Sequence, residues 1–505
     1  MMRLPVARTL LLMLLLTLPA WAIETPDGAA VLNHAWFVCQ LQGHKVGYAE
    51  DLVYEKDGRI YTLSEMKLTI RRGPLEVAVS QATTFIETAD HVPVQIESQT
   101  KTAGMATVVT MDFDAQAKEV KVTRSQFGKP VTTTQPWPTG DWMTPEQAWD
   151  YTHKQVLAGA KEITVSVLDG SSGLQVVDTT MQRVGDAKVD LVGRTAPGVE
   201  WTSRVSLMPS LKTTVFTDLD GRTLRTQTAV MPGMDMTVIR ADKALALSPN
   251  DPAELMLNTM IKSDKHIADP RGLRTAKFQL APKQPGMLKD LQLPTTAVQR
   301  CERDGETLVV TVDLDAPAKP ETLTPEQRQA CLKPSLMLDS DDDAVQALLK
   351  KSGVQAMKDD DAKARALTQF VRRSIASKNL SVGLATASEV ARTLEGDCTE
   401  HAVLLAALLR AAGVPSRCVS GITYADGFMQ QQQIFAYHMW TQAYLDGRWV
   451  DLDAALPFAD GQPPFDATHI ALDVDPMDED QIQNMMLDLI PLMNRFSVSV
   501  LEAKP

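Results

Sequence analysis

The stretch after Cys398 constrains the fold most, because a helix formed by it would be apolar on every side. A turn at Gly396-Asp397 precedes it, and Gly413 follows it with Pro415 two residues later. These start and stop signals predict a helix from about Cys398 to Ala412. The apolar side chains in its interior are Val403, Leu404, Leu405, Leu408 and Leu409. Such a helix must be largely covered by other elements, which makes it a rigid platform with a cysteine at its first turn.

The position of Cys398 favours chemistry at its sulfur. At a helix N-terminus, unsatisfied backbone N–H groups and the helix dipole stabilise a thiolate, which is the nucleophilic form of cysteine. The same N–H groups could hold an oxyanion that forms during acyl transfer. We therefore expect Cys398 to be a nucleophile with a lowered pKa.

A hairpin is predicted further along the chain, around Asp446-Gly447. This dipeptide is a strong signal for a two-residue turn of type I′. With that turn, the numbers of paired residues add to 893. Gln442 then faces Asp451, and Trp440 faces Asp453.

The predicted pairing also selects a partner for His438. Side chains alternate along a strand, so His438 lies on the same face as Trp440. His438 and Asp453 are then diagonal neighbours, at roughly 7–8 Å between their backbones, and the carboxylate can reach the imidazole. Asp451 lies on the same face but further along the strand, which makes it the weaker partner.

Cys398, His438 and Asp453 are together the parts of a thiol acyl-transfer centre. His438 would draw the thiol proton, and Asp453 would fix the orientation and tautomer of the imidazole. His401 lies three residues along the same helix and stays open as another base. His469 is interpreted as a loop or core residue. The hairpin alone cannot bring Cys398 next to His438.

Four blocks of this part of the chain resemble the transglutaminase-like superfamily of cysteine acyltransferases and peptidases, in order and in spacing. The blocks are Gly396-Asp397-Cys398, Ala411–Arg417, Tyr437–Trp440 and Trp449–Asp453, within roughly residues 340–475. The resemblance implies Cys398 as nucleophile, His438 as base and Asp453 as orienting acid. It also implies an α+β fold with a papain/transglutaminase-like core, in which helices lie against an antiparallel sheet, and activities that include amide hydrolysis and amide transfer to amines.

The sequence departs from the family pattern near the nucleophile. Papain-like enzymes often carry a glutamine for the oxyanion hole shortly before the cysteine, and residues 392–397 contain none. Asp453 is followed by Ala454, where proline is commoner. The side-chain donor to the oxyanion is therefore unassigned, and some members of the family have lost activity.

The rest of the chain is predicted to be β-rich. Alternating β-branched residues and turn signals run through residues 23–247. Thr144-Pro145-Glu146 starts a helix there, which could join two similar halves of this domain. A cluster of helix and strand breakers at 248–252 begins a smaller β-rich domain over 248–335, and the catalytic domain takes residues 336–505.

Residues 1–22 have the pattern of a signal peptide. Two arginines precede an apolar run from Leu10 to Leu18, and Ala20-Trp21-Ala22 has the small-x-small form of a cleavage site. We expect an exported protein, periplasmic or secreted, without a membrane span after cleavage. Of the five cysteines, Cys301 and Cys331 could form a disulfide in that oxidising compartment, whereas Cys418 is expected to be buried packing.

The charge and the histidines exclude two classes of function. The formal net charge is −13 and no basic patch is present, which excludes a nucleic-acid partner. The eight histidines are scattered without the spacing of a metal site, so we expect neither a metal nor another cofactor.

These observations predict an exported cysteine-dependent enzyme that acts on amide bonds of protein or peptide substrates through a thioester. It would be a peptidase or amidase, or a protein-glutamine transferase with an amine acceptor. Hydrolysis is favoured, because water needs no dedicated second-substrate site. The alternative is a catalytically silent transglutaminase-like binding module of the cell envelope, whose thiol would react like that of an ordinary cysteine.

Overall fold

The structure is a computed structural model of the chain. It describes residues 25–505, apart from residues 73–74, 103–104, 127–128, 170–173, 232–233, 253–258, 290, 318–319, 377–384, 459–463 and 477–492. The predicted signal peptide, residues 1–22, lies outside the described residues. No helix within the described residues is long and apolar enough to cross a membrane.

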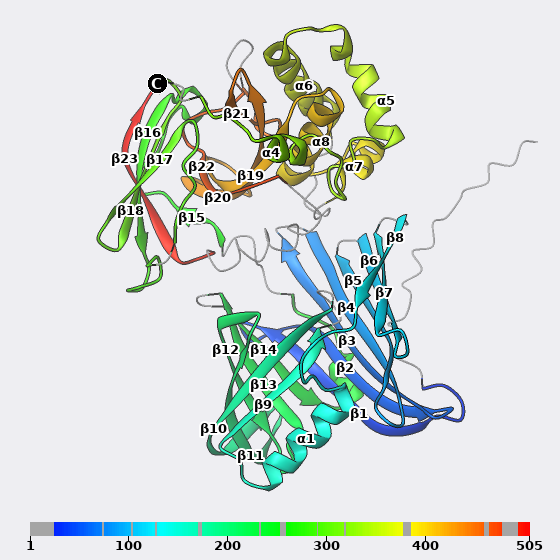
Figure 1. Cartoon of the computed structure of the whole chain (residues 1–505). Coiled ribbons are helices and arrows are strands. Elements are labelled where there is room, and N and C mark those ends of the chain that lie inside the picture. Colours follow the sequence, from blue (N-terminus) through cyan, green and yellow to red (C-terminus); the bar gives the residue numbers. More distant parts are fainter. Residues whose placement is uncertain are drawn as a thin grey trace, which may run out of the picture.

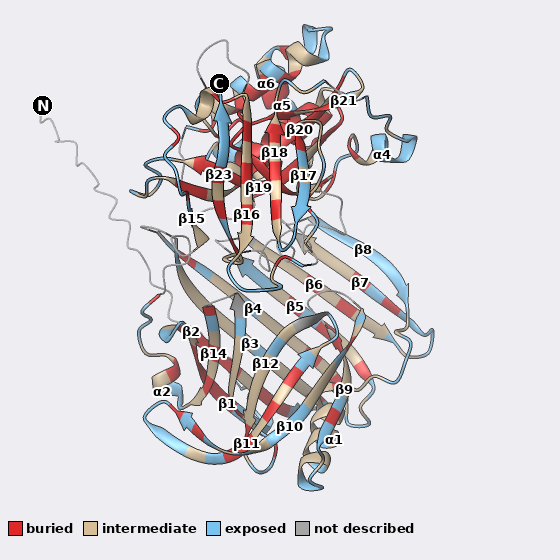
Figure 2. Cartoon of the chain, turned by 90° about the vertical axis from the view of Figure 1, so that its left-hand side faces the viewer, coloured by how far each residue is buried: buried red, intermediate tan, exposed pale blue. Residues whose placement is uncertain are grey.

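The N-terminal part is one antiparallel sheet, in which the described residues form fourteen strands. The strands are β1 (Ala30–Leu41), β2 (His44–Lys56), β3 (Arg59–Arg72), β4 (Leu75–Thr88), β5 (Pro93–Thr102), β6 (Met105–Asp114), β7 (Glu119–Gln126), β8 (Lys129–Pro136), β9 (Glu162–Asp169), β10 (Gln175–Leu191), β11 (Arg194–Val205), β12 (Met208–Thr217), β13 (Thr223–Met231) and β14 (Met234–Ala241). Consecutive strands pair with each other except β8 and β9, and β1 pairs with β14, so β8 and β9 are the two edges. Half-buried residues are the most numerous class in this sheet, ahead of the exposed and the buried ones (Figure 2).

Helix α1 (Pro145–Leu157) connects the two edge strands of this sheet. It starts as predicted, since Thr144 is its N-cap, Pro145 is its first residue, and Thr144 and Gln147 form a capping box. The helix stands between a run of eight consecutive strands and a run of six. A short helix, α2 (Lys243–Ala246), follows the last strand.

A smaller antiparallel sheet has the order β17-β18-β16-β23. Its strands are β16 (Thr275–Pro282), β17 (Gln299–Asp304), β18 (Thr307–Asp313) and β23 (Phe496–Lys504). The sheet thus takes its fourth strand from the end of the chain, while the domain limits at 248 and 336 stay predictions. The disulfide that the sequence allowed between Cys301 and Cys331 is not formed.

The C-terminal part combines helices with a second sheet, which confirms the predicted α+β class (Figure 1). The sheet has the order β15-β20-β19-β22, and β21 also pairs with β20. Its elements are β15 (Ile261–Lys262), β19 (Ser416–Ala425), β20 (Ile434–Leu445), β21 (Arg448–Leu452) and β22 (Ile470–Asp475), and the helices are α4 (Pro325–Ala330), α5 (Asp343–Ser352), α6 (Asp360–Ser374), α7 (Ala387–Thr393) and α8 (Cys398–Ala411).

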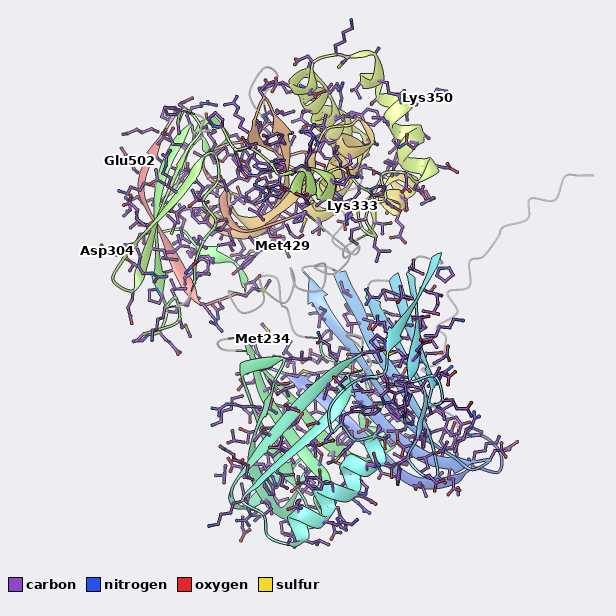
Figure 3. The ribbon with its side chains drawn as sticks, viewed as in Figure 1. Met234, Asp304, Lys333, Lys350, Met429 and Glu502 are labelled. Carbon is purple, nitrogen blue, oxygen red and sulfur yellow. The ribbon has the colours of Figure 1, made fainter. Side chains whose placement is uncertain are left out.

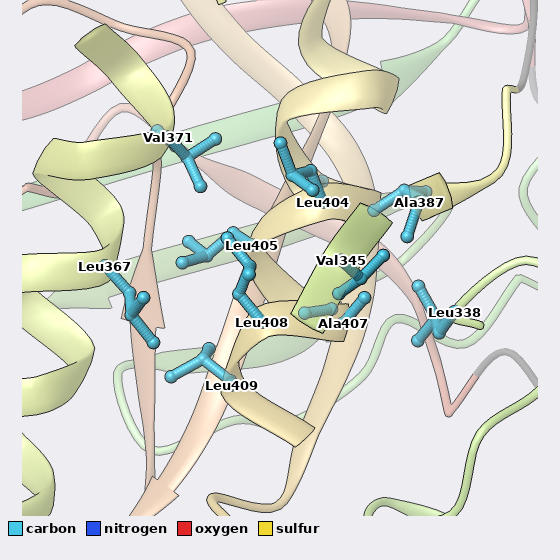
Figure 4. Packing of buried hydrophobic residues seen from close by; sticks show 14 of the residues in the cluster. Leu338, Val345, Leu367, Val371, Ala387, Leu404, Leu405, Ala407, Leu408 and Leu409 are labelled. Atoms are coloured by element: carbon cyan, nitrogen blue, oxygen red, sulfur yellow. The ribbon is translucent and has the colours of Figure 1, made fainter. Parts of the chain in front are cut away.

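Helix α8 lies at the centre of the main hydrophobic core, as its apolar sequence predicts. The core joins α8 to α5, α6 and α7 on one side and to the sheet on the other (Figure 4). Leu404, Leu405, Leu408 and Leu409 are fully buried in it. Burying each such side chain stabilises the fold by roughly 1.5–3 kcal/mol, so the helix that starts at Cys398 is held rigidly.

Candidate active site

Cys398 is the first residue of α8, where the sequence places it. Asp397 is the N-cap, and its carboxylate accepts hydrogen bonds from the backbone N–H and the hydroxyl of Thr399. Glu400 completes a capping box, because its carboxylate accepts from the backbone N–H of Asp397. The other oxygen of Glu400 accepts from Ala385 N–H, which ties the start of α8 to the start of α7. Cys398 thus lies at a helix end that two carboxylates cap.

The turn before Cys398 requires glycine at position 396. Gly396 has φ +145°, and a Cβ there would lie 2.3 Å from the Cβ and Cγ of Glu400. We expect Gly396→Ala to destabilise the domain by about 2 kcal/mol and to slow acylation of Cys398, because backbone strain and the clash displace the cap.

The matched control is Gly413→Ala at the other end of α8. Gly413 also has a positive φ, +81°, but an added Cβ would meet nothing within 4 Å. Urea unfolding should show a loss of only about 1 kcal/mol for the control. Equal losses for the two variants would contradict a special role of the Gly396–Glu400 contact.

The hairpin forms with the predicted turn and register. Asp446 and Gly447 have φ +49° and +78°, as a type I′ turn requires. Thr441 pairs with Leu452, and Gln442 pairs with Asp451, so the paired numbers add to 893. The structure then brings His438 and Asp453 together, with Nε2 of His438 2.8 Å from Oδ2 of Asp453.

Cys398 meets this hairpin at a gap in the edge of β20. Within the described residues, β15 pairs with β20 only at 434–435 and β21 only at 441–445. Between them the edge of β20 has no strand partner, and the backbone N–H of Met439 in this gap is close enough to the Cys398 thiol to lower its pKa. The thiol is therefore held beside the residue that follows His438 in the strand.

Asp453 is buried and accepts four hydrogen bonds, two at each carboxylate oxygen. Oδ2 lies 2.8 Å from Nε2 of His438 and 3.1 Å from Nε2 of His469. Oδ1 accepts from the backbone N–H groups of Ala455 and Leu456. Burial alone would raise the pKa of this carboxyl, but the charges and hydrogen bonds of the two histidines hold its pKa well below the usual range. Asp453 is thus a fixed anion.

The electrostatics of Cys398 differ from the sequence prediction of a lowered pKa. Burial raises the pKa of this thiol well above its usual value, and the negative charges of Asp397, Glu400 and Asp453 add to the rise, against the Met439 hydrogen bond. Burial and Asp397 also raise the pKa of Glu400, to about 7. The prediction of a lowered pKa considered only the N–H groups and the dipole of the helix end. In the structure the carboxylates of Asp397 and Glu400 cap this end, and their negative charge disfavours a thiolate. The resting thiol is consequently protonated.

His469 is the site residue that the sequence interpretation missed. It immediately precedes β22, and its ring is buried between Asp453 and Asp466. Arg271 pairs with the far side of Asp466. The Asp466-x-Thr468-His469 stretch carries no recognisable local signal, because its link to Asp453 exists only in the folded domain.

The two alternative residues have other partners. Asp451 accepts hydrogen bonds from the indole N–H of Trp440 and the amide of Gln442, each at 2.8 Å, and not from His438. His401 is buried, and its Nδ1 lies 2.6 Å from the carbonyl oxygen of Asp397 in its own helix. The geometry therefore favours Asp453 as the acid and His438 as the base.

Three side chains of the site are close enough to bind one metal ion together. The ligand atoms of His438, Asp453 and His469 all lie within 4.8 Å of one another. Both Nε2 atoms, however, lie at hydrogen-bonding distance from one oxygen of Asp453. A ring nitrogen that is protonated donates to Asp453 at these distances and then has no lone pair for a metal.

A family model matches the region that carries this geometry. It is described as the Transglutaminase-like superfamily, and it matches residues 346–454. Residues 346–454 are a transglutaminase-like domain. The match includes Cys398, His438 and Asp453, and it ends before His469. The comparison with curated proteins gives no match.

Three solved structures show remote similarity to the chain. A beta-barrel-like protein of domain of unknown function DUF1849 from Brucella abortus has 14% identity and a TM-score of 0.32, over 41% of this chain and 95% of its own. A candidate cysteine protease from Cytophaga hutchinsonii has 14% identity and a TM-score of 0.28, over 46% and 84%. The periplasmic domain of TgpA from Pseudomonas aeruginosa, bound to ethylmercury, has 15% identity and a TM-score of 0.26, over 39% and 88%. We draw no conclusion about this chain from these three.

Proposed function

We propose that the transglutaminase-like domain is a thiol acyl-transfer enzyme with Cys398 as nucleophile, His438 as base and Asp453 as orienting acid. The observation that carries the proposal is the buried His438–Asp453 hydrogen bond of 2.8 Å, beside Met439, whose backbone N–H acts on the Cys398 thiol. Asp453 engages Nε2 of His438, which leaves Nδ1 as the nitrogen that accepts a proton.

The reaction begins from a neutral thiol. Sγ of Cys398 attacks an amide carbonyl carbon, and the thiol proton passes to Nδ1 of His438. The C–N bond then breaks, and the amine leaves with the proton from His438. Water or an amine attacks the resulting thioester and gives its proton to His438, which returns it to the departing Cys398 sulfur.

The start of α8 supplies support for the oxyanion. The backbone N–H of Cys398 lies at the first helical position, where no helical carbonyl precedes it. This donor compensates for the missing glutamine in the segment 392–397. A side-chain donor is not required for the proposal.

The substrate class we propose is the amide bond of a protein or peptide, in the periplasm or outside the cell. We also propose that the loop at residues 426–433, between β19 and β20, contacts an extended substrate. It contains the run Gln430–Gln433 and ends five residues before His438. Figure 3 labels Met429, which lies in this loop at the edge of the C-terminal part. Hydrolysis remains the preferred outcome over transfer to an amine.

An activated ester tests the chemistry without knowledge of the natural substrate. We expect the full chain, mixed with p-nitrophenyl acetate, to release a burst of p-nitrophenolate and to carry an acetyl group on Cys398, as detected by peptide mass spectrometry. His438→Ala should slow this acylation by about 10²–10⁴-fold, since general-base catalysis is lost.

Cys301 provides the matched control, because it is also a free and incompletely buried cysteine but lies in β17, outside the site. Cys301→Ser should acylate like the wild type. Acylation that proceeds equally well with and without His438, or no acylation of Cys398, would instead favour the catalytically silent binding module.

A further inference from the structure

His469 occupies a position that only a charged imidazole can satisfy. Its Nε2 lies 3.1 Å from Oδ2 of Asp453. Its Nδ1 lies 3.0 Å from the carbonyl oxygen of Asp466 and 3.4 Å from the carboxylate of the same residue. All of these partners are acceptors. A neutral imidazole has a single N–H, so only the cation donates at both nitrogens.

The carboxylates around His469 favour this charge. The carboxylates of Asp453, Asp466 and, at longer range, Asp451 act on it. Two cationic or titratable groups oppose them, since Arg271 pairs with Asp466 and His438 shares Asp453. The rings of Trp440 and Phe465 close the pocket at 5.1 and 4.2 Å between centroids. Burial alone would lower the pKa of His469, but the two adjacent carboxylates raise it to about 9.

We propose that His469 is a positioning residue whose buried cation shares Asp453 with His438 and so keeps the Cys398–His438 pair neutral until a substrate binds. The inference rests on the proposed function and deepens it. It concerns the protonation state of Cys398 and His438 before a substrate binds. The three residues of the triad alone do not determine that state.

The physical reason is that the negative charge of Asp453 interacts with two imidazole rings at once, those of His438 and His469. Both histidines contact the same oxygen of Asp453. If Asp453 served His438 alone, its full charge would favour an imidazolium at His438 and hence a thiolate at Cys398. The centroids of the two rings are 5.6 Å apart. At an effective dielectric constant of about 20, a positive charge at that distance opposes the proton transfer by roughly 100- to 200-fold.

The test is the alkylation rate of Cys398 by iodoacetamide as a function of pH, followed by peptide mass spectrometry on the full chain. The variant His469→Gln retains an amide N–H for Asp453 but has no charge. We expect it to react about tenfold or more faster than the wild type at pH 6.5, because proton transfer from Cys398 to His438 becomes favourable. The labelling of Cys301 in the same sample should not change.

The double variant His438→Ala/His469→Gln shows whether faster alkylation comes from the lost charge of His469 or from greater exposure of Cys398. Without His438 no group receives the thiol proton, so the gain should disappear. The proposal is overturned if the faster alkylation of Cys398 persists in the double variant. It is also overturned if the pH profile of His469→Gln keeps the wild-type shape while the alkylation rate falls at every pH. These outcomes leave the proposed function intact, since that function fails only if the ester does not acylate Cys398 through His438.

A second measurement tests the charge of His469 in the wild-type chain. The ¹⁵N spectrum of the wild-type chain labelled at histidine should contain an imidazolium that is still protonated at pH 8, and His469→Gln should lack it. Spectra in which every histidine is neutral at pH 8 would also overturn the proposal.

Discussion

Asp453→Asn is expected to lower the acylation rate of Cys398 by about 10³–10⁴-fold and the stability of the domain by about 3–5 kcal/mol. Each carboxylate oxygen of Asp453 accepts two hydrogen bonds, from two histidines at Oδ2 and from two backbone N–H groups at Oδ1. An asparagine amide has only one oxygen, so in either orientation its NH₂ group faces two donors. The buried His469 cation also loses half of its compensating charge. Ester acylation and urea unfolding measure the two effects.

Asp451→Asn is the matched control for this substitution. Asp451 lies on the same hairpin and is also buried, but its Oδ1 accepts both of the side-chain hydrogen bonds that it receives, from Trp440 and Gln442. Its Oδ2 has no hydrogen-bond partner among the described residues. Burial raises the pKa of this carboxyl. An amide oriented with its oxygen toward Trp440 therefore fits, and we expect changes of less than about 1 kcal/mol. If the two asparagine variants behaved alike, the four-bond argument for Asp453 would fail.

The parts of the site that could be predicted from the sequence are those fixed by local rules. The Asp446-Gly447 turn determines the register of β20 and β21, and the register selects Asp453 over Asp451 as the partner of His438. The apolar stretch after Cys398 likewise predicts a buried helix with the cysteine at its start. In both cases a short segment carries all of the information.

The parts that could not be predicted depend on contacts between distant segments. His469 reaches Asp453 only because β22 lies beside β19 in the folded sheet. The raised pKa of Cys398 depends chiefly on burial in the folded domain and in part on Asp453, which comes from a distant segment. Similarly, alternation predicts strands in the N-terminal region, but not that β1 closes against β14, or that β23 pairs with β16 across more than 200 residues.

The charge on His469 makes a second prediction, on the pH dependence of stability. The pKa of His469 is about 9 in the folded domain, against 6.5 for the unperturbed side chain. A raised pKa contributes stability that is fully present below the unfolded value and is lost as the pH rises through the folded value. Between pH 6.5 and 9, the free energy of unfolding should therefore fall by about 2–3 kcal/mol through this residue alone.

Two chains isolate this contribution, His438→Ala and His438→Ala/His469→Gln, since neither contains the second imidazole on Asp453. Cys418 reports the unfolding of the domain, because it is buried in β19 and becomes open to alkylation only when the sheet opens. Labelling of Cys418 in urea, corrected with the rate in the unfolded chain at each pH, gives both stabilities. Effects shared by the two chains, such as ionisation of the cysteines and of Glu400, cancel in the difference. The single variant should lose about 2–3 kcal/mol more than the double variant over this range, and parallel curves would show that His469 is neutral in the folded domain.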